Sequence, residues 1–192
     1  MKKIIALLLI VVSLLALAAC KAPADDLAPF KAALKDSAPV GATINSKLEI
    51  NGTVLNGEYN VLYTDGVATV VYTNEILNAF PAEGALPAEK TEVPGNATVD
   101  AEGTVTAGSI GQNFAALAAH KITLDADKMT YSISGGILVA TLSAADGAAL
   151  TTVPATTDVT LNITTFDGKL TGISVSYGTD AGVVSIVCVY VY

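Results

Sequence analysis

The side chains that carry out most enzyme chemistry are scarce in this sequence. The chain has one histidine, His120, and two cysteines, Cys20 and Cys188, and it has neither arginine nor tryptophan. It contains no Gly-x-Ser-x-Gly, Walker or His-Glu-x-x-His motif and no dinucleotide fingerprint. His120 falls at the end of an expected helix, where positive charge interacts favourably with the helix dipole. We therefore expect a protein that is not an enzyme and that uses no cofactor.

Carboxylates are the one abundant reactive group. Eighteen Asp and Glu residues outnumber ten lysines and give a formal net charge of −8. Asp125 and Asp127 resemble half of a calcium loop, but the Gly and Glu that such a loop needs do not follow, so we expect a turn and no metal site. A carboxylate pair in a cleft would suffice for sugar hydrolysis, which keeps a hydrolase open as a third alternative. An acidic chain without arginine excludes nucleic acid as a partner.

The first 19 residues have the layout of a cleaved export signal. A basic start, Met1-Lys2-Lys3, precedes an apolar run from Ile4 to Ala19, which is shorter than the roughly 20 residues of a membrane-spanning helix. The run ends in Leu17-Ala18-Ala19-Cys20, which resembles the lipobox of bacterial lipoproteins. The resemblance implies cleavage before Cys20 and diacylglycerol on its thiol, with acyl chains such as palmitate. We expect an extracytoplasmic protein that this lipid anchors to a bacterial membrane, with residues 20–26 as a lipidated tether.

The second cysteine is expected to be structural. Acylation of Cys20 leaves Cys188 without a partner for an intramolecular disulfide. Cys188 alternates with Ile186 and Tyr190 in an apolar terminal strand, and no cation lies nearby in the sequence to activate its thiol. A buried, inert thiol is the expectation.

Residues 27–192 are expected to form a single β-rich domain. The spacing of Leu27, Phe30 and Leu34 predicts a helix with one apolar stripe, and Ser109 can cap a second helix carrying Phe114 and Leu117. Residues 81–103, which contain three prolines and are rich in Glu, predict an irregular acidic loop. The final strand is apolar on both sides, so we expect it to be central or covered.

Three Gly-containing turns predict hairpins. A two-residue loop at Asp65-Gly66 brings pairs of apolar and tyrosine side chains onto one face. A loop at Gly135-Gly136 does the same for a second hairpin. In the third hairpin a three-residue loop ending at Gly168 is preferred, because it keeps the apolar residues on one face. The expected pairs are Tyr63 with Ala68, Val61 with Val70, Tyr59 with Tyr72, Met129 with Leu142, Tyr131 with Ala140, Ile133 with Leu138, and Leu161 with Ile173.

These elements predict an α+β fold: a curved antiparallel β-sheet, or open half-barrel, with one or two short helices covering one face. A helix ending in Lys35-Asp36-Ser37, a run from Leu48 to Gly52 that leads into hairpins, and a closing meander from Val159 to Tyr177 carry a resemblance. The chain resembles the lipoprotein-carrier superfamily of half-barrels, the LolA-like and LppX/LprG-like lipoproteins. The resemblance implies acyl chains held between sheet and helices. The chain departs from LolA-like carriers in lacking the interior arginine that they use. The expected lipid anchor fits the LppX/LprG or receptor type better than a soluble shuttle.

We therefore expect a membrane-anchored envelope lipoprotein that binds a lipid or another hydrophobic ligand. The alternative is a non-catalytic surface interaction or structural lipoprotein with a solid core, because an apolar face under a helix is often simply dry core. The sequence indicates no particular protein partner. The candidate ligand-binding residues are Tyr59, Val61, Tyr63, Val70, Tyr72, Phe114, Leu117, Met129, Tyr131 and Ile133.

Replacement of the expected acylation site tests the anchor. We expect Cys20→Ser to release or mislocalise the protein without unfolding it, because Cys20 precedes the domain and its thiol would carry the acyl chains that hold the protein at the bilayer. Fractionation of cells that express each chain measures the outcome. A Cys20→Ser chain that stays in the membrane fraction would contradict the lipobox interpretation.

Overall fold

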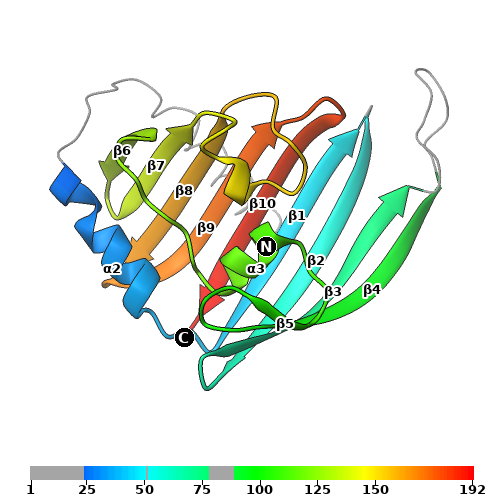
Figure 1. The fold of residues 1–192 in the computed structure, drawn as a ribbon, viewed down its shortest axis with the longest axis horizontal. Helices are drawn as coiled ribbons and strands as arrows, with labels where there is room; N and C mark the ends of the chain where they lie inside the picture. Colours follow the sequence, from blue (N-terminus) through cyan, green and yellow to red (C-terminus); the bar gives the residue numbers. More distant parts are fainter. Residues whose placement is uncertain (1–23, 51, 78–88) are drawn as a thin grey trace.

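A computed structural model describes residues 24–50, 52–77 and 89–192, which form one curved, unclosed antiparallel sheet of ten strands with short helices, an α+β fold (Figure 1). The expected fold class is confirmed. The export signal and Cys20 lie outside the described residues. The strands are β1 (Gly41–Ile50), β2 (Thr53–Thr64), β3 (Val67–Leu77), β4 (Lys90–Val99), β5 (Val105–Gly108), β6 (Met129–Ser134), β7 (Ile137–Leu142), β8 (Val159–Phe166), β9 (Lys169–Gly178) and β10 (Gly182–Val191); the α-helices are α2 (Ala28–Asp36) and α3 (Gln112–Ala118), and the 3-10 helices are η1 (Ala24–Leu27) and η2 (Ala148–Leu150).

Two meanders meet in the middle of the sheet. The strand order is β5-β4-β3-β2-β1-β10-β9-β8-β7-β6, so β1 pairs with β10 and the first and last strands lie side by side. The two outermost strands, β5 and β6, are consecutive in the sequence. Residues 109–128, which include α3, therefore cross one whole face of the sheet to join its two edges (Figure 1).

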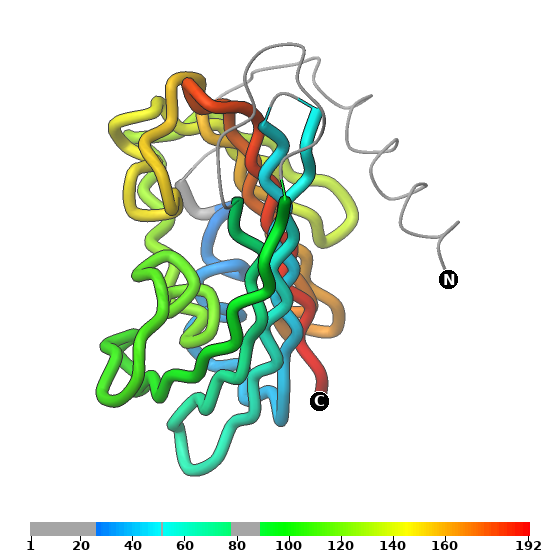
Figure 2. The backbone as a smooth tube through the Cα atoms, turned by 90° about the vertical axis from the view of Figure 1, so that its right-hand side faces the viewer, coloured from blue at the N-terminus to red at the C-terminus, as the bar shows by residue number. Residues whose placement is uncertain are grey.

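The core lies on the face that this crossing segment covers, here called the inner face. Both α-helices and η2 lie on that side of the sheet (Figure 2). Side chains alternate along the central strands such as β1 and β10, so one set is buried against the helices and the other faces outward. Helix α2 contributes Phe30, Ala33 and Leu34 to the core, and α3 contributes Phe114 and Leu117 among others. Most of the inner face is thus packed against protein.

Three tyrosine hydroxyls fasten α3 and its flanks to the sheet. The hydroxyl groups of Tyr63 and Tyr190 donate hydrogen bonds to the carbonyl oxygens of Ala118 (2.6 Å) and Leu117 (2.7 Å) at the end of the helix. The Tyr72 hydroxyl donates to the Ser109 carbonyl (2.7 Å) before the helix begins. A seven-residue helix is too short to be stable alone. These bonds and its buried face hold it in place.

Two hairpin registers match the expectation from the turns. Tyr59 pairs with Tyr72 across β2 and β3, and Met129 pairs with Leu142 across β6 and β7. Asp65 and Gly66 have φ of 51° and 78°, and Gly135 and Gly136 have 56° and 79°. Positive φ at both central residues is the type I′ geometry that matches the twist of paired strands. The turn residues thus fix which side chains face inward.

The third hairpin differs from the prediction. Leu161 pairs with Val175 and not with Ile173, and the loop has two residues, Asp167 and Gly168, with φ of 54° and 76°. A bulge between Thr164 and Thr165 inserts one extra residue into the partner strand. That residue shifts the alternation by one position, so the apolar side chains still share a face.

The expected irregular loop over 81–103 is wrong for its second half. Residues 90–99 form β4, which pairs with β3 along its length, whereas residues 81–88 lie outside the described residues. Strand β5 pairs only with Ala97–Val99, so the first half of β4 is an exposed edge. Pro94 lies in that half, where a missing N–H costs no ladder hydrogen bond and polar side chains meet solvent. This edge strand therefore lacks the alternation of apolar and polar residues from which strands are predicted.

The last strand is central, as expected, but it is covered on one face only. On its outer face Val187 is 42% exposed and Val189 49% exposed. Among the residues that the structure describes, no helix is long and apolar enough to cross a membrane.

The contribution of the buried Tyr190 hydroxyl to stability can be measured. We expect Tyr190→Phe to lower the free energy of unfolding by about 1 kcal/mol, because it deletes a buried hydrogen bond. Tyr72→Phe is the matched control, since its hydrogen bond is exposed and water can replace the hydroxyl. Denaturant titration measures both variants, and an equal loss in the two would contradict the anchoring role of Tyr190.

Candidate functional site

The sheet opens between β2 and β3, and a cleft forms at the opening. Backbone pairing between the two strands ends at Gly57 and Asn74, whereas β2 continues to pair with β1 as far as Thr53, and β3 with β4 as far as Leu77. The two hairpins therefore diverge beyond Gly57, as the upper part of Figure 1 shows. We call this opening the fork.

Side chains replace the missing backbone ladder at the fork. The Glu75 carboxylate accepts hydrogen bonds from the Asn56 backbone N–H (2.7 Å) and the Lys90 ammonium (2.9 Å). Lys90 also donates to the Val54 carbonyl oxygen (3.0 Å). The hydrogen bond from Lys90, followed by that from Asn56, lowers the pKa of Glu75. These side-chain hydrogen bonds thus connect β2, β3 and β4 where the backbone ladder between β2 and β3 is missing.

The floor of the cleft holds polar groups without charge. Two charged residues, Lys47 and Glu75, also line the cleft, and each is paired, with Glu49 and with Lys90 respectively. Gly57 has no side chain, and Ser46 and Asn74 from the flanking strands lean into the space that a Cβ would occupy. Burial raises the pKa of the adjacent Tyr59, and hydrogen bonds with Asn74 and Ser46 oppose that rise. Tyr59 therefore stays neutral at physiological pH, and the floor offers hydroxyl and amide groups.

Apolar side chains form the walls, and residues 152–153 form the roof. Asn113, which is buried, donates from Nδ2 to the Thr152 hydroxyl (3.0 Å), and the Thr152 N–H donates to the Tyr177 hydroxyl (2.9 Å). These bonds hold the roof over a cleft of about 220 Å³. Its apolar lining is Leu48, Leu55, Ile76, Phe114, Val153 and Val184.

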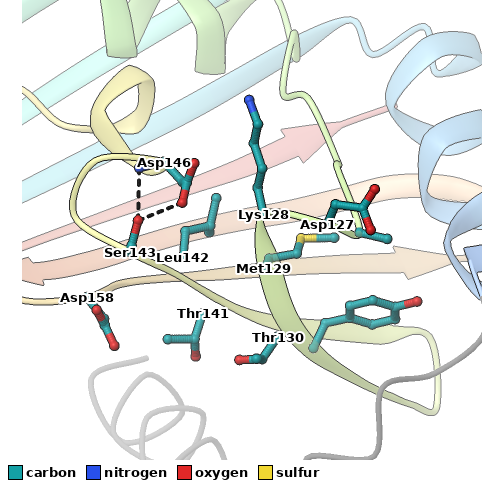
Figure 3. Close-up of a pocket in the computed structure, with 11 residues that line it drawn as sticks. Asp127, Lys128, Met129, Thr130, Thr141, Leu142, Ser143, Asp146 and Asp158 are labelled. Atoms are coloured by element: carbon teal, nitrogen blue, oxygen red, sulfur yellow. Dashed lines mark hydrogen bonds between the residues drawn. The ribbon is translucent and has the colours of Figure 1, made fainter.

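A second pocket, of about 430 Å³, lies at the edge strand β6 (Figure 3). Three carboxylates line it, those of Asp127, Asp146 and Asp158, together with Lys128. The Ser143 hydroxyl donates to the Asp146 carboxylate (2.6 Å) and accepts from the Asp146 backbone N–H (3.2 Å). The hydrogen bonds between Ser143 and Asp146 thus cap a turn. The single histidine of the sequence, His120, lines a different pocket. In the described parts of the chain no group of three or more His, Cys, Asp or Glu side chains is arranged to hold a metal ion.

Most of the candidate ligand-binding residues are core or anchoring residues. Only Tyr59 and Phe114 line the fork cleft, where their rings stack with centroids 4.3 Å apart. Met129 and Tyr131 line the pocket of Figure 3, and Ile133, expected on the same inner face, is 36% exposed. Val61, Val70 and Leu117 are buried in the core, and Tyr63 and Tyr72 hold α3.

The cleft residues that the sequence interpretation missed continue a pattern it had found. Asn74 and Ile76 lie on the same face of β3 as Tyr72, two and four residues further on. Leu55 and Gly57 likewise precede Tyr59 on the inner face of β2. Extending the alternation beyond the paired tyrosines would have found all four.

The remaining candidate residues are structural. Cys188 is fully buried, and burial raises the pKa of its thiol to about 12, in agreement with an inert thiol. His120 follows α3, but its surroundings disfavour the expected positive charge. Burial lowers its pKa, the hydrogen bond to the Leu34 carbonyl opposes this effect, and the charge of Lys121 adds to it.

Comparison of the chain with protein-family models, with curated proteins and with solved structures found no match. The likeness to half-barrel carriers therefore remains an expectation from the sequence.

The lowered pKa of His120 predicts a pH dependence of stability. As the pH falls below about 6.5, an unfolded histidine takes up a proton and the buried one does not, so protons favour the unfolded state. Stability is thus present above that pH and is lost as the pH falls through the folded pKa. We expect His120→Asn, which tolerates the positive φ of 44° at this position, to lose less stability than the wild type between pH 7.5 and 5.5. Denaturant midpoints at the two pH values measure this, and parallel losses would contradict it.

Proposed function

We propose that this protein is a membrane-anchored, non-catalytic binding protein of the bacterial envelope that takes a hydrophobic ligand in the fork cleft. The observation that carries the proposal is the composition of the cleft, which is lined mostly by apolar side chains and by a few polar ones. Its two charged lining residues, Lys47 and Glu75, are each engaged in an ion pair, and hydrogen bonds hold Thr152 beside the cleft. Ligand sites are typically concave and apolar, with a few polar groups that orient the ligand. The lipobox-like sequence ending at Cys20 supports the anchor.

The cleft limits what the ligand can be. Its volume of about 220 Å³ lies below the roughly 300–1,000 Å³ of typical drug-sized pockets. A small apolar molecule, or the end of an acyl chain whose remainder leaves through the fork, matches this size. Ser46, Asn74 and Tyr59 offer hydrogen bonds to one polar group of the ligand. The inner face under α2 and α3 is packed, so the proposal places the ligand in the cleft and not beneath the helices.

A second candidate function rests on the outer face. The outward-facing residues of β9 and β10 between 172 and 191 are glycine, serine and valine, with no charged side chain among them. An uncharged sheet face of this kind suits a protein partner better than it suits bulk solvent. This is the interaction-module alternative.

A pair of leucine substitutions on one strand tests the cleft. Leu55 lines the cleft, whereas Leu62, on the same strand, is 62% exposed on the outer face. We expect Leu55→Trp to fill the cleft and weaken binding of the neutral probe N-phenyl-1-naphthylamine by at least about tenfold, or roughly 1.4 kcal/mol. Leu62→Trp should bind the probe as the parent chain does. The parent is the full chain carrying Cys20→Ser, and probe fluorescence measures the affinity.

Organic extraction of the same preparations, followed by mass spectrometry, identifies the bound compound. We expect an acyl or other apolar molecule with the parent and with Leu62→Trp, and less of it with Leu55→Trp. A parent chain that is empty and binds no probe would overturn the proposal and favour the interaction module.

A further inference from the structure

Some lysines of this acidic protein form ion pairs with carboxylates and others do not. Within the described residues, Lys47 pairs with Glu49 (3.2 Å) and Lys90 with Glu75 (2.9 Å). The Lys169 ammonium lies 4.9 Å from the centre of the Tyr192 ring. The remaining described lysines form no ion pair with the part of the chain that the structure describes; they are Lys31, Lys35, Lys121 and Lys128.

Three of these four line one pocket. Lys31 and Lys35 stand four residues apart on α2, so their side chains share a helix face. The His120 ring donates from Nδ1 to the Leu34 carbonyl oxygen (2.8 Å), and this bond joins the middle of the crossing segment to α2. Lys121 is thereby brought to the same opening. The pocket has a volume of about 210 Å³, with Leu34 and Thr123 also in its lining.

The pocket concentrates positive charge. Among the residues that the structure describes, no Asp or Glu side chain lines it, although the chain as a whole is strongly acidic. Like charges at i, i+4 on a helix repel, and the charge of Lys121 is close enough to disfavour protonation of His120. The helix dipole favours cations near the C-terminus of α2, which explains why Lys35 is favourable at its position. The dipole does not explain the presence of Lys121 at the pocket, because Lys121 belongs to another segment.

We propose that this pocket is an oxyanion site that binds a phosphate group. Three ammonium groups match the charge of a phosphate or phosphoryl group, and lysine serves such groups as a point charge. The Thr123 hydroxyl adds a donor. The phosphate can belong to a free anion or to a phospholipid headgroup, and the chemistry of recognition is the same. The site is separate from the fork cleft and does not depend on the proposed function.

The single histidine offers a direct readout. We titrate inorganic phosphate into the full chain in nonionic detergent micelles at constant ionic strength, with chloride as the balancing ion. The His120 ring resonances, unique in this sequence, report on the pocket. We expect a saturable shift, and a rise in the His120 pKa when phosphate is bound, because an anion stabilises the imidazolium. Lys35→Gln and Lys121→Gln should each weaken phosphate binding by about tenfold.

The control variant is Lys128→Gln, which removes one positive charge outside the pocket and should leave phosphate binding unchanged. A second titration, with phosphatidylglycerol added to phosphate-free micelles, distinguishes the sources. A shift with phosphatidylglycerol assigns the site to a headgroup, and a shift with inorganic phosphate alone assigns it to a free anion. No saturable shift in either titration overturns the proposal, as do equal affinities in all variants.

Discussion

The open sheet depends on one constraint, which is that its inner face must be covered although the sheet does not close. Because β1 and β10 pair at the centre, the two edges of the sheet are consecutive in the sequence. Residues 109–128 have to travel from one edge to the other, and they do so across the inner face. Their apolar side chains, with those of α2, turn an exposed apolar surface into a core.

The rest of the molecule follows from the path of this cover. Tyrosine hydroxyls of the sheet bond to carbonyl groups at both ends of α3, and His120, which follows α3 in the same segment, bonds to α2. Where the cover stops short, near the upper ends of β1, β2 and β3, the sheet divides and the fork cleft remains. The lysine pocket lies where this segment contacts α2, and the fork cleft lies where the segment no longer covers the sheet.

The sequence predicted the parts of the fold that local rules determine. Asp65-Gly66 and Gly135-Gly136 fix both turn type and register, and the alternation beside them fixes which face is buried. The β8–β9 register was not predicted correctly, because an alternating pattern does not reveal a single bulged residue. Strand β4 was not predicted, because half of it is an edge of the sheet, where proline and glutamate are tolerated. The alternation along β2 and β3 marks cleft residues such as Leu55 and Ile76 as inward-facing, but it does not show that the strands separate there. The separation depends on the loss of pairing beyond Gly57, which Glu75 and Lys90 stabilise across three strands.

The central pairing of the first and last strands also determines the order in which the protein can assemble. Gly41 on β1 pairs with Val191 on β10, so the ladder that joins the two meanders closes a loop of nearly the whole described chain. Each meander can form from neighbouring hairpins, but β1 keeps an unpaired edge until the final residues are present. Contacts between residues so distant in sequence form slowly, because the entropy of closing the loop must be overcome first. A chain that lacks β10 would therefore present two separate half-sheets with open edges, and open edges are where β-proteins associate with one another.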